Sequence, residues 1–189
     1  MRTYSIFAPA FAAALGMATV IPDTGKASDL PSLPNGFFSG VNHANGSSTL
    51  SFEATGEVLT FKPSHDQVRV QKRTPPFGHT DCWTFQPELN HAGVDAGVAA
   101  FRNRLSFSGF DLGHDAGPAY YGFNNDGVYV YFCYNTKAIA RGTVEMEDLD
   151  FATYWTDVDC GPYKPGFFQW DSPLLFGKTL SGTAVCLGS

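Results

Sequence analysis

The C-terminal two thirds of this sequence predict an α+β fold in which two helices cover one face of an antiparallel sheet and disulfides reinforce the core. Two segments repeat apolar residues at helical spacing, and several short aromatic and β-branched runs lie between clusters of turn residues. All four cysteines follow residue 81. With 43% hydrophobic residues in 189, the chain has enough apolar surface to bury a core.

The first predicted unit is a strand followed by a helix. Residues 80–85 favour a strand. Apolar residues then recur at spacings of four, three and four, which places them on one helix face: Val94, Val98, Phe101 and Leu105. Asn90 precedes this pattern and suits the N-cap, because its side chain can accept a hydrogen bond from the first turn.

A β-hairpin is predicted next. Residues 119–123 and 128–133 are aromatic and β-branched, and Asn124-Asn125-Asp126-Gly127 joins them. Asn, Asp and Gly tolerate the positive φ angles of tight hairpin turns. The two segments should therefore pair as antiparallel neighbours.

A second helix is predicted after Thr143. Thr143 can cap it, and acidic residues fill its first turn, where the positive end of the helix dipole favours them. Its apolar stripe consists of Met146, Leu149, Ala152, Trp155 and Val158. Gly161-Pro162 should end this helix, and residues 166–170 and 179–187 supply one or two closing strands.

The order strand, helix, strand, strand, helix, strand is the split βαβ order of ferredoxin-like α/β sandwiches. Both helices should then pack on one face of the sheet. In an oxidising compartment four cysteines form two disulfides, with three possible pairings. We favour a Cys82–Cys133 bridge between the first and third strands, and a Cys160–Cys186 bridge from the second helix to the last strand.

The N-terminal part has the features of a secretory precursor. A short basic start precedes an apolar run that ends in small residues, so residues 1–18 are predicted to be a signal peptide. Lys72-Arg73 is a dibasic step of the kind that kexin-type proteases cut. We therefore expect a secreted, extracellular protein with a candidate pro-segment of residues 19–73 and a mature domain of residues 74–189.

The candidate pro-segment has strand signals of its own. Leu50-Ser51-Phe52 and Val58-Leu59-Thr60-Phe61 flank Ala54-Thr55-Gly56, a pattern typical of a hairpin. Asn45 begins a glycosylation sequon. Two interpretations of residues 34–63 stay open. They form either a removable segment that aids folding or keeps the mature part inactive, or permanent strands of one domain.

Charge argues against two classes of partner. Residues 74–189 contain six Lys plus Arg against thirteen Asp plus Glu, a net charge of −7. Phosphate backbones and anionic lipids attract basic surfaces rather than acidic ones. Nucleic acid and stable membrane insertion are therefore not expected.

Several features together resemble fungal secreted effectors. They are the signal sequence, Lys72-Arg73, Asp81-Cys82 before the first helix, Tyr131-Phe132-Cys133 in a central strand, and a late helix followed by a cysteine-bearing strand. Residues 74–189 are similar in architecture to the killer-toxin-like and necrosis-inducing families, whose members are small disulfide-bonded α/β sandwiches. The resemblance implies a toxin or virulence factor that binds a surface protein or glycan of a host or competing microbe, and it assigns no individual functional residue.

Tyrosines on the predicted hairpin suggest a second hypothesis, a secreted glycan- or cell-wall-binding module. The candidate binding residues are Tyr120, Tyr121, Tyr129, Tyr131 and Tyr134. On paired strands they can line one sheet face and stack on sugar rings. Alternatively they pack in the core, with Val128, Val130 and Phe132 facing the helices.

A small secreted hydrolase is the third hypothesis. It ranks last because the sequence has few catalytic signals. His114-Asp115 is a candidate metal or general-base pair in a glycine-rich loop. Glu88, His91 and Arg102 are residue types that a guanyl-type ribonuclease uses, but they fall around the first helix instead of on one sheet. Three late aspartates lack the spacing of a calcium loop: Asp157, Asp159 and Asp171. We expect no catalytic residue, metal or cofactor.

Overall fold

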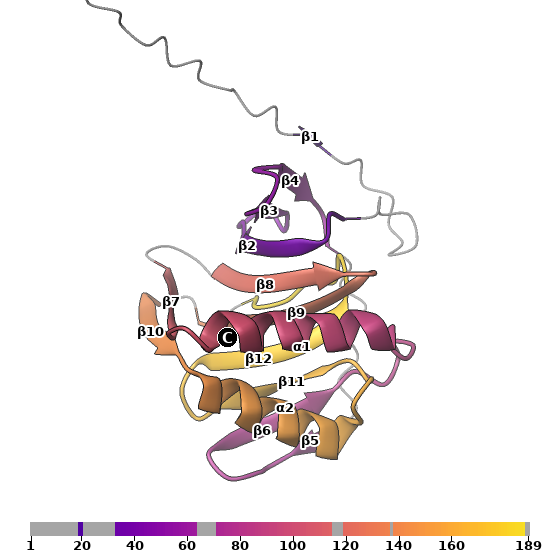
Figure 1. The fold of residues 1–189 in the computed structure, drawn as a ribbon, viewed down its shortest axis with the longest axis vertical. Coiled ribbons are helices and arrows are strands. Elements are labelled where there is room, and N and C mark those ends of the chain that lie inside the picture. The colour runs from indigo at the N-terminus through magenta and orange to yellow at the C-terminus, as the bar shows by residue number, and fades with distance from the viewer. Residues whose placement is uncertain (1–18, 21–32, 64–70, 115–118, 137, 188–189) are drawn as a thin grey trace, which may run out of the picture.

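The structure is a computed structural model of the chain, and it describes residues 19–20, 33–63, 71–114, 119–136 and 138–187. Within these residues, two helices lie on one face of a largely antiparallel sheet (Figure 1): α1 (His91–Leu105) and α2 (Met146–Cys160). The α+β class and the placement of both helices on one face are confirmed.

Ten strands of the described residues form the sheet, in the order β1-β4-β3-β2-β8-β9-β12-β11-β6-β5. In chain order they are β1 (Thr19–Val20), β2 (Gly36–Asn42), β3 (Ser48–Phe52), β4 (Val58–Phe61), β5 (Gln71–Arg73), β6 (Gly78–Cys82), β8 (Ala119–Asn125), β9 (Val128–Tyr134), β11 (Gly166–Trp170) and β12 (Leu174–Leu180). A separate antiparallel pair consists of β7 (Phe110–His114) and β10 (Ala140–Val144).

The split βαβ arrangement itself is not confirmed, because β12 lies between β9 and β11. The first strand of the predicted unit, β6, pairs with β11 and β5. The closing strand was predicted at residues 179–187, but it begins at Leu174. Leu174, Leu175 and Phe176 are all buried, so this strand is covered on both faces and has no alternating pattern to reveal it.

Several local predictions are confirmed. The side chain of Asn90 accepts a hydrogen bond from the Gly93 amide at 3.2 Å and caps α1. The hairpin turn between β8 and β9 has positive φ at Asp126 (47°) and Gly127 (77°), as the Asn-Asn-Asp-Gly run predicts. Strands β3 and β4 form the predicted antiparallel hairpin.

The predicted start of α2 is wrong. Thr143 lies in β10, where its Oγ1 donates to Asp111 Oδ1 at 2.9 Å across the β7–β10 pair. Glu145 is the N-cap instead, and it forms a capping box with Asp148. The predicted end at Gly161 is confirmed. Val158, which was assigned to the apolar stripe, is 52% exposed.

All four cysteines lie in described residues and form two disulfides, but the predicted pairing is wrong. The bridges are Cys82–Cys160 and Cys133–Cys186, with Cα–Cα distances of 5.4 and 6.2 Å. Cys82 pairs in register with Gly166, and its side chain lies on the helix face, below the end of α2. Cys133 belongs to the cluster on the opposite face. Because β12 and β11 also separate the two strands, Cys82 and Cys133 cannot meet.

The sheet separates two apolar cores. On the helix side, Val128, Val130 and Phe132 of β9 pack with residues of α1 and α2. On the other side, Tyr129, Tyr131 and Cys133 of the same strand pack with residues of β2, β3 and β4. Alternate side chains of a strand point to opposite faces, and all seven residues of β9 are buried.

The N-terminal strands belong to the same sheet as residues 74–189, since β2 pairs with β8. Lys72-Arg73 lies in β5, which pairs with β6. Asn45 is exposed in the turn between β2 and β3. Cleavage and glycosylation stay predictions, and the predicted signal peptide at residues 1–18 lies outside the described residues.

Helix α1 approaches β9 closely at Gly97. A methyl group at this position would overlap Cγ2 of Val130. In a solvent-exposed helix Gly→Ala stabilises by about 1 kcal/mol. We expect Gly97→Ala instead to lower the free energy of unfolding by about 1 to 3 kcal/mol, because the packed sheet cannot accommodate the methyl group. Chemical denaturation measures the change.

Ala99→Gly is the control for that measurement, because Ala99 is exposed on the same helix. It should cost about 1 kcal/mol from helix propensity alone. A Gly97→Ala variant more stable than the parent would contradict the close contact between α1 and β9.

Candidate functional site

The predicted tyrosine row is not a surface. Tyr120, Tyr129 and Tyr131 are 3%, 0% and 1% exposed, because the N-terminal strands cover them. The Phe38 ring of β2, for example, lies 4.9 Å from the Tyr129 ring. These three side chains cannot stack on a sugar in this structure, and the alternative interpretation as core is correct for them.

The other two candidate tyrosines lie on the helix side of the sheet. Tyr134 is 9% exposed and packs in the helix-side core. Tyr121 stacks on Phe37, with ring centroids 5.4 Å apart, and its hydroxyl donates to Glu53 at 2.8 Å. Tyr121 therefore joins β8 to the N-terminal strands, and neither residue forms part of a tyrosine row.

The ribonuclease-type residues do not converge. His91 Nε2 lies 2.6 Å from Glu88 Oε1, and the His91 ring stacks on Tyr163. Lys164 also contacts Glu88, and these contacts lower the pKa of Glu88, chiefly through the hydrogen bond from His91. Arg102 is 11 residues further along α1, about 16 Å at the rise of a helix. His114 ends β7, and Asp115 lies outside the described residues, so that pair stays a prediction.

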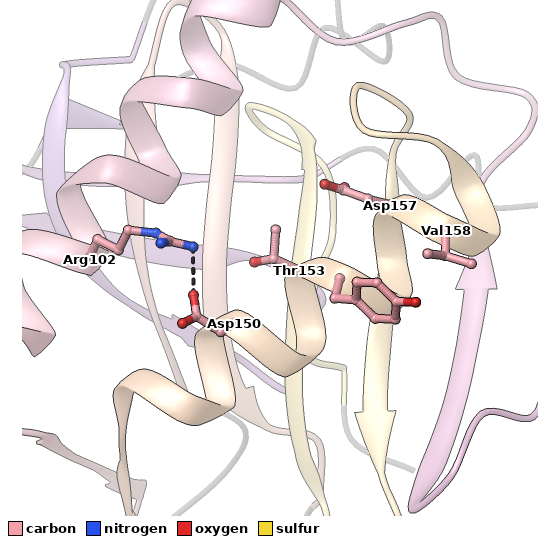
Figure 2. A pocket seen from close by; sticks show the side chains of 6 residues that line it. Arg102, Asp150, Thr153, Asp157 and Val158 are labelled. Carbon is pink, nitrogen blue, oxygen red and sulfur yellow. Dashed lines mark hydrogen bonds and ion pairs between the residues drawn. The ribbon is translucent and has the colours of Figure 1, made fainter.

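A groove lies between the two helices (Figure 2). It has a volume of about 520 Å³ and is lined by Arg102 from α1 and, from α2, by Asp150, Thr153, Tyr154, Asp157 and Val158. The α2 residues recur at spacings of three or four and so share one face of that helix. We call this feature the interhelix groove.

One ion pair crosses the interhelix groove. Arg102 Nη2 donates to Asp150 Oδ1 at 2.5 Å, and Figure 2 shows the two side chains reaching toward each other from α1 and α2. Both side chains are about half exposed, at 53% and 52%. An exposed ion pair contributes only about 0 to 1 kcal/mol, so a ligand can replace either partner at little cost.

A buried lysine forms an ion pair with Asp157, one of the residues that line the groove. The lysine is Lys178 of β12, which is 1% exposed. Its Nζ also donates to the carbonyl of Pro162 at 2.5 Å. Burial lowers the pKa of Lys178, and the hydrogen bond from Lys178 to Asp157 opposes that shift. Asp157 is thus fixed in place where it lines the groove.

The remaining lining residues suit a polar ligand with an apolar face. Thr153 Oγ1 is buried and has no hydrogen-bond partner among the described residues. Tyr154 is 60% exposed and presents an aromatic surface. The guanidinium of Arg102, the carboxylates of Asp150 and Asp157, and the ring of Tyr154 can together bind hydroxyl groups and the flat face of a sugar or a peptide side chain.

Sequence reasoning missed this site. Asp150, Thr153 and Tyr154 are not among the predicted site residues, and Arg102 is predicted only as a ribonuclease-type residue. A usable signal existed, because Tyr154 falls outside the apolar stripe of α2 and lies four residues after Asp150. An aromatic residue on the polar face of a helix is a candidate contact residue.

The described residues show neither a metal centre nor a membrane-spanning helix. They contain no group of three or more His, Cys, Asp or Glu side chains placed to hold a metal ion. Within the same part of the chain, no helix has the length and apolar character that crossing a membrane requires.

Comparisons with protein-family models, curated proteins and solved structures gave no match to this chain.

The buried tyrosines predict a loss of stability in alkali. Burial raises the pKa of Tyr120, Tyr129 and Tyr131, so the folded protein keeps these phenols neutral. The unfolded chain ionises them near pH 10, about the usual tyrosine value. The free energy of unfolding should therefore be unaffected by them below about pH 10 and fall as pH rises above it. Denaturation curves across this range, with tyrosinate absorbance recorded in parallel, test the prediction.

Tyr129→Phe removes one of the three phenols and should make that fall less steep. Ionisation of every tyrosine near pH 10 in protein that keeps its native circular dichroism would show that the tyrosines are accessible and contradict the prediction.

Proposed function

We propose that this chain is a secreted effector of the killer-toxin-like or necrosis-inducing type, which binds a surface protein or glycan of a host or competing microbe through the interhelix groove. The proposal includes secretion and a relation to the split βαβ sandwiches. Two disulfides and a pair of helices on one face of the sheet support it. The observation that carries it is the groove itself.

The geometry of the groove favours a ligand that lies across the surface. Four of its lining residues are at least half exposed: Arg102, Asp150, Tyr154 and Val158. A shallow groove of this kind cannot enclose a small molecule, whereas deep clefts bury most of a small ligand. Arg and Tyr are also the side chains that most often dominate the binding energy of protein interfaces.

The test is a cell-death assay on host tissue together with a growth-inhibition assay on competing microbes. We expect the Arg102→Ala, Tyr154→Ala double variant to lose at least about tenfold in potency. Removing both contact side chains should cost at least about 1.4 kcal/mol of binding free energy, which corresponds to a tenfold change in affinity. Phe107→Ala is the control, since Phe107 is an 85% exposed aromatic residue outside the groove. A folded double variant with full potency would exclude the groove as the binding site.

The second candidate function is glycan binding, and the exposed ring of Tyr154 beside the carboxylates of Asp150 and Asp157 favours it. We expect the protein to be retained on insoluble chitin or glucan. Tyr154→Ala should reduce retention at least about tenfold, whereas Tyr154→Phe should keep it, because the ring face does the stacking. Retention without toxicity would favour this function over the first. Equal retention of all three forms would rule out Tyr154 as the contact.

A further inference from the structure

We propose that residues 33–63 are a permanent part of the working protein and stay bound to residues 74–189 even where Lys72-Arg73 is cut. No disulfide crosses the dibasic step, because all four cysteines lie after it. A cut chain would therefore be a two-chain protein held together without covalent bonds. This inference concerns which segments of the chain make up the working protein, and it is independent of the interhelix groove.

The first support is strand pairing. β2 pairs with β8 over six residue pairs, from Gly36 with Asn124 to Val41 with Ala119. β8 has β9 on its other side, so β2 fills the edge that β8 would otherwise expose. An exposed strand edge has unpaired backbone groups and invites aggregation.

The second support is the shared core. Six apolar side chains of the segment are at most 8% exposed and belong to one cluster with Tyr120, Tyr129 and Tyr131: Leu33, Phe38, Leu50, Phe52, Leu59 and Phe61. Removing the segment would expose the aromatic face of β8 and β9. A patch of that kind is rare on soluble monomers.

The third support is a set of polar contacts that join the segment to two other parts of the chain. Asn124 Nδ2 of β8, which is buried, donates to the carbonyls of Leu33 and Pro34 at 2.9 and 2.8 Å. Asn42 Nδ2 of β2 donates to the carbonyls of Val185 and Cys186 at 2.8 and 3.0 Å. The segment is thus held at both ends of β2.

The fourth support is a cluster at the end of α1. Arg104 lies 5.1 Å from the ring centroids of both Phe37 and Tyr121. Arg104 also forms an ion pair with Glu53 in the turn between β3 and β4, with Nη1 and Oε2 3.1 Å apart. Helix α1 therefore contacts the segment directly, in addition to the sheet.

The decisive measurement is the native mass of the folded protein secreted by a host that has a kexin-type protease, followed by denaturing gel analysis without reduction. We expect either an uncut chain or a native complex that separates on the gel into a fragment ending at Arg73 and a fragment starting at Thr74. A folded 74–189 domain found alone would overturn the proposal.

A matched pair of variants tests the coupling independently of cleavage. All three tryptophans lie in residues 74–189, so their fluorescence reports the unfolding of that part. Phe38→Leu should lower the denaturation midpoint seen by this fluorescence, because Phe38 is fully buried against Tyr129. Val41→Ala, on the same strand at 39% exposure, should leave it unchanged. Equal midpoints for both variants and the parent would also overturn the proposal.

Discussion

The burial of β9 on both faces is the constraint on which the rest of the fold depends. Every residue from Val128 to Tyr134 is buried, so both sides of the strand need an apolar cover. The helices provide one cover. The other comes from the N-terminal strands and the chain after β12, where Val185 and Cys186 join the same cluster. A chain that begins at residue 74 has enough elements for the first cover, but it lacks the strands that complete the second.

Large aromatic side chains fit between these layers because glycines lie opposite them. Tyr131 packs over Gly177, and Tyr120 packs over Gly40, in each case on its cross-strand partner. Phe38 covers Gly122 in the same way. A side chain on any of these glycines would overlap the ring above it. At these three positions a glycine leaves the space that the opposite ring fills, which keeps the packing between the strands dense without steric overlap.

Features that depend on adjacent residues were predictable from the sequence, and features that depend on strand order were not. The Asn90 cap and the Asn124–Gly127 turn follow from local hydrogen bonding and φ preferences. The disulfide pairing depends on which sheet face each cysteine occupies and on the insertion of β12, and neither has a local signal. The groove was missed for the same reason, because Arg102 and Asp150 are 48 residues apart and meet only after the helices pack.

The position of α2 is fixed at one end by bonds that do not involve α1. The Cys82–Cys160 disulfide joins its last residue to β6, and Lys178 holds Asp157 one turn earlier. By contrast, the Arg102–Asp150 ion pair, which joins the two helices directly, is exposed. The groove therefore has one anchored wall, the C-terminal end of α2, while the exposed Arg102–Asp150 pair can exchange partners with a ligand. Such preorganisation lowers the entropy cost of binding without requiring a deep cavity.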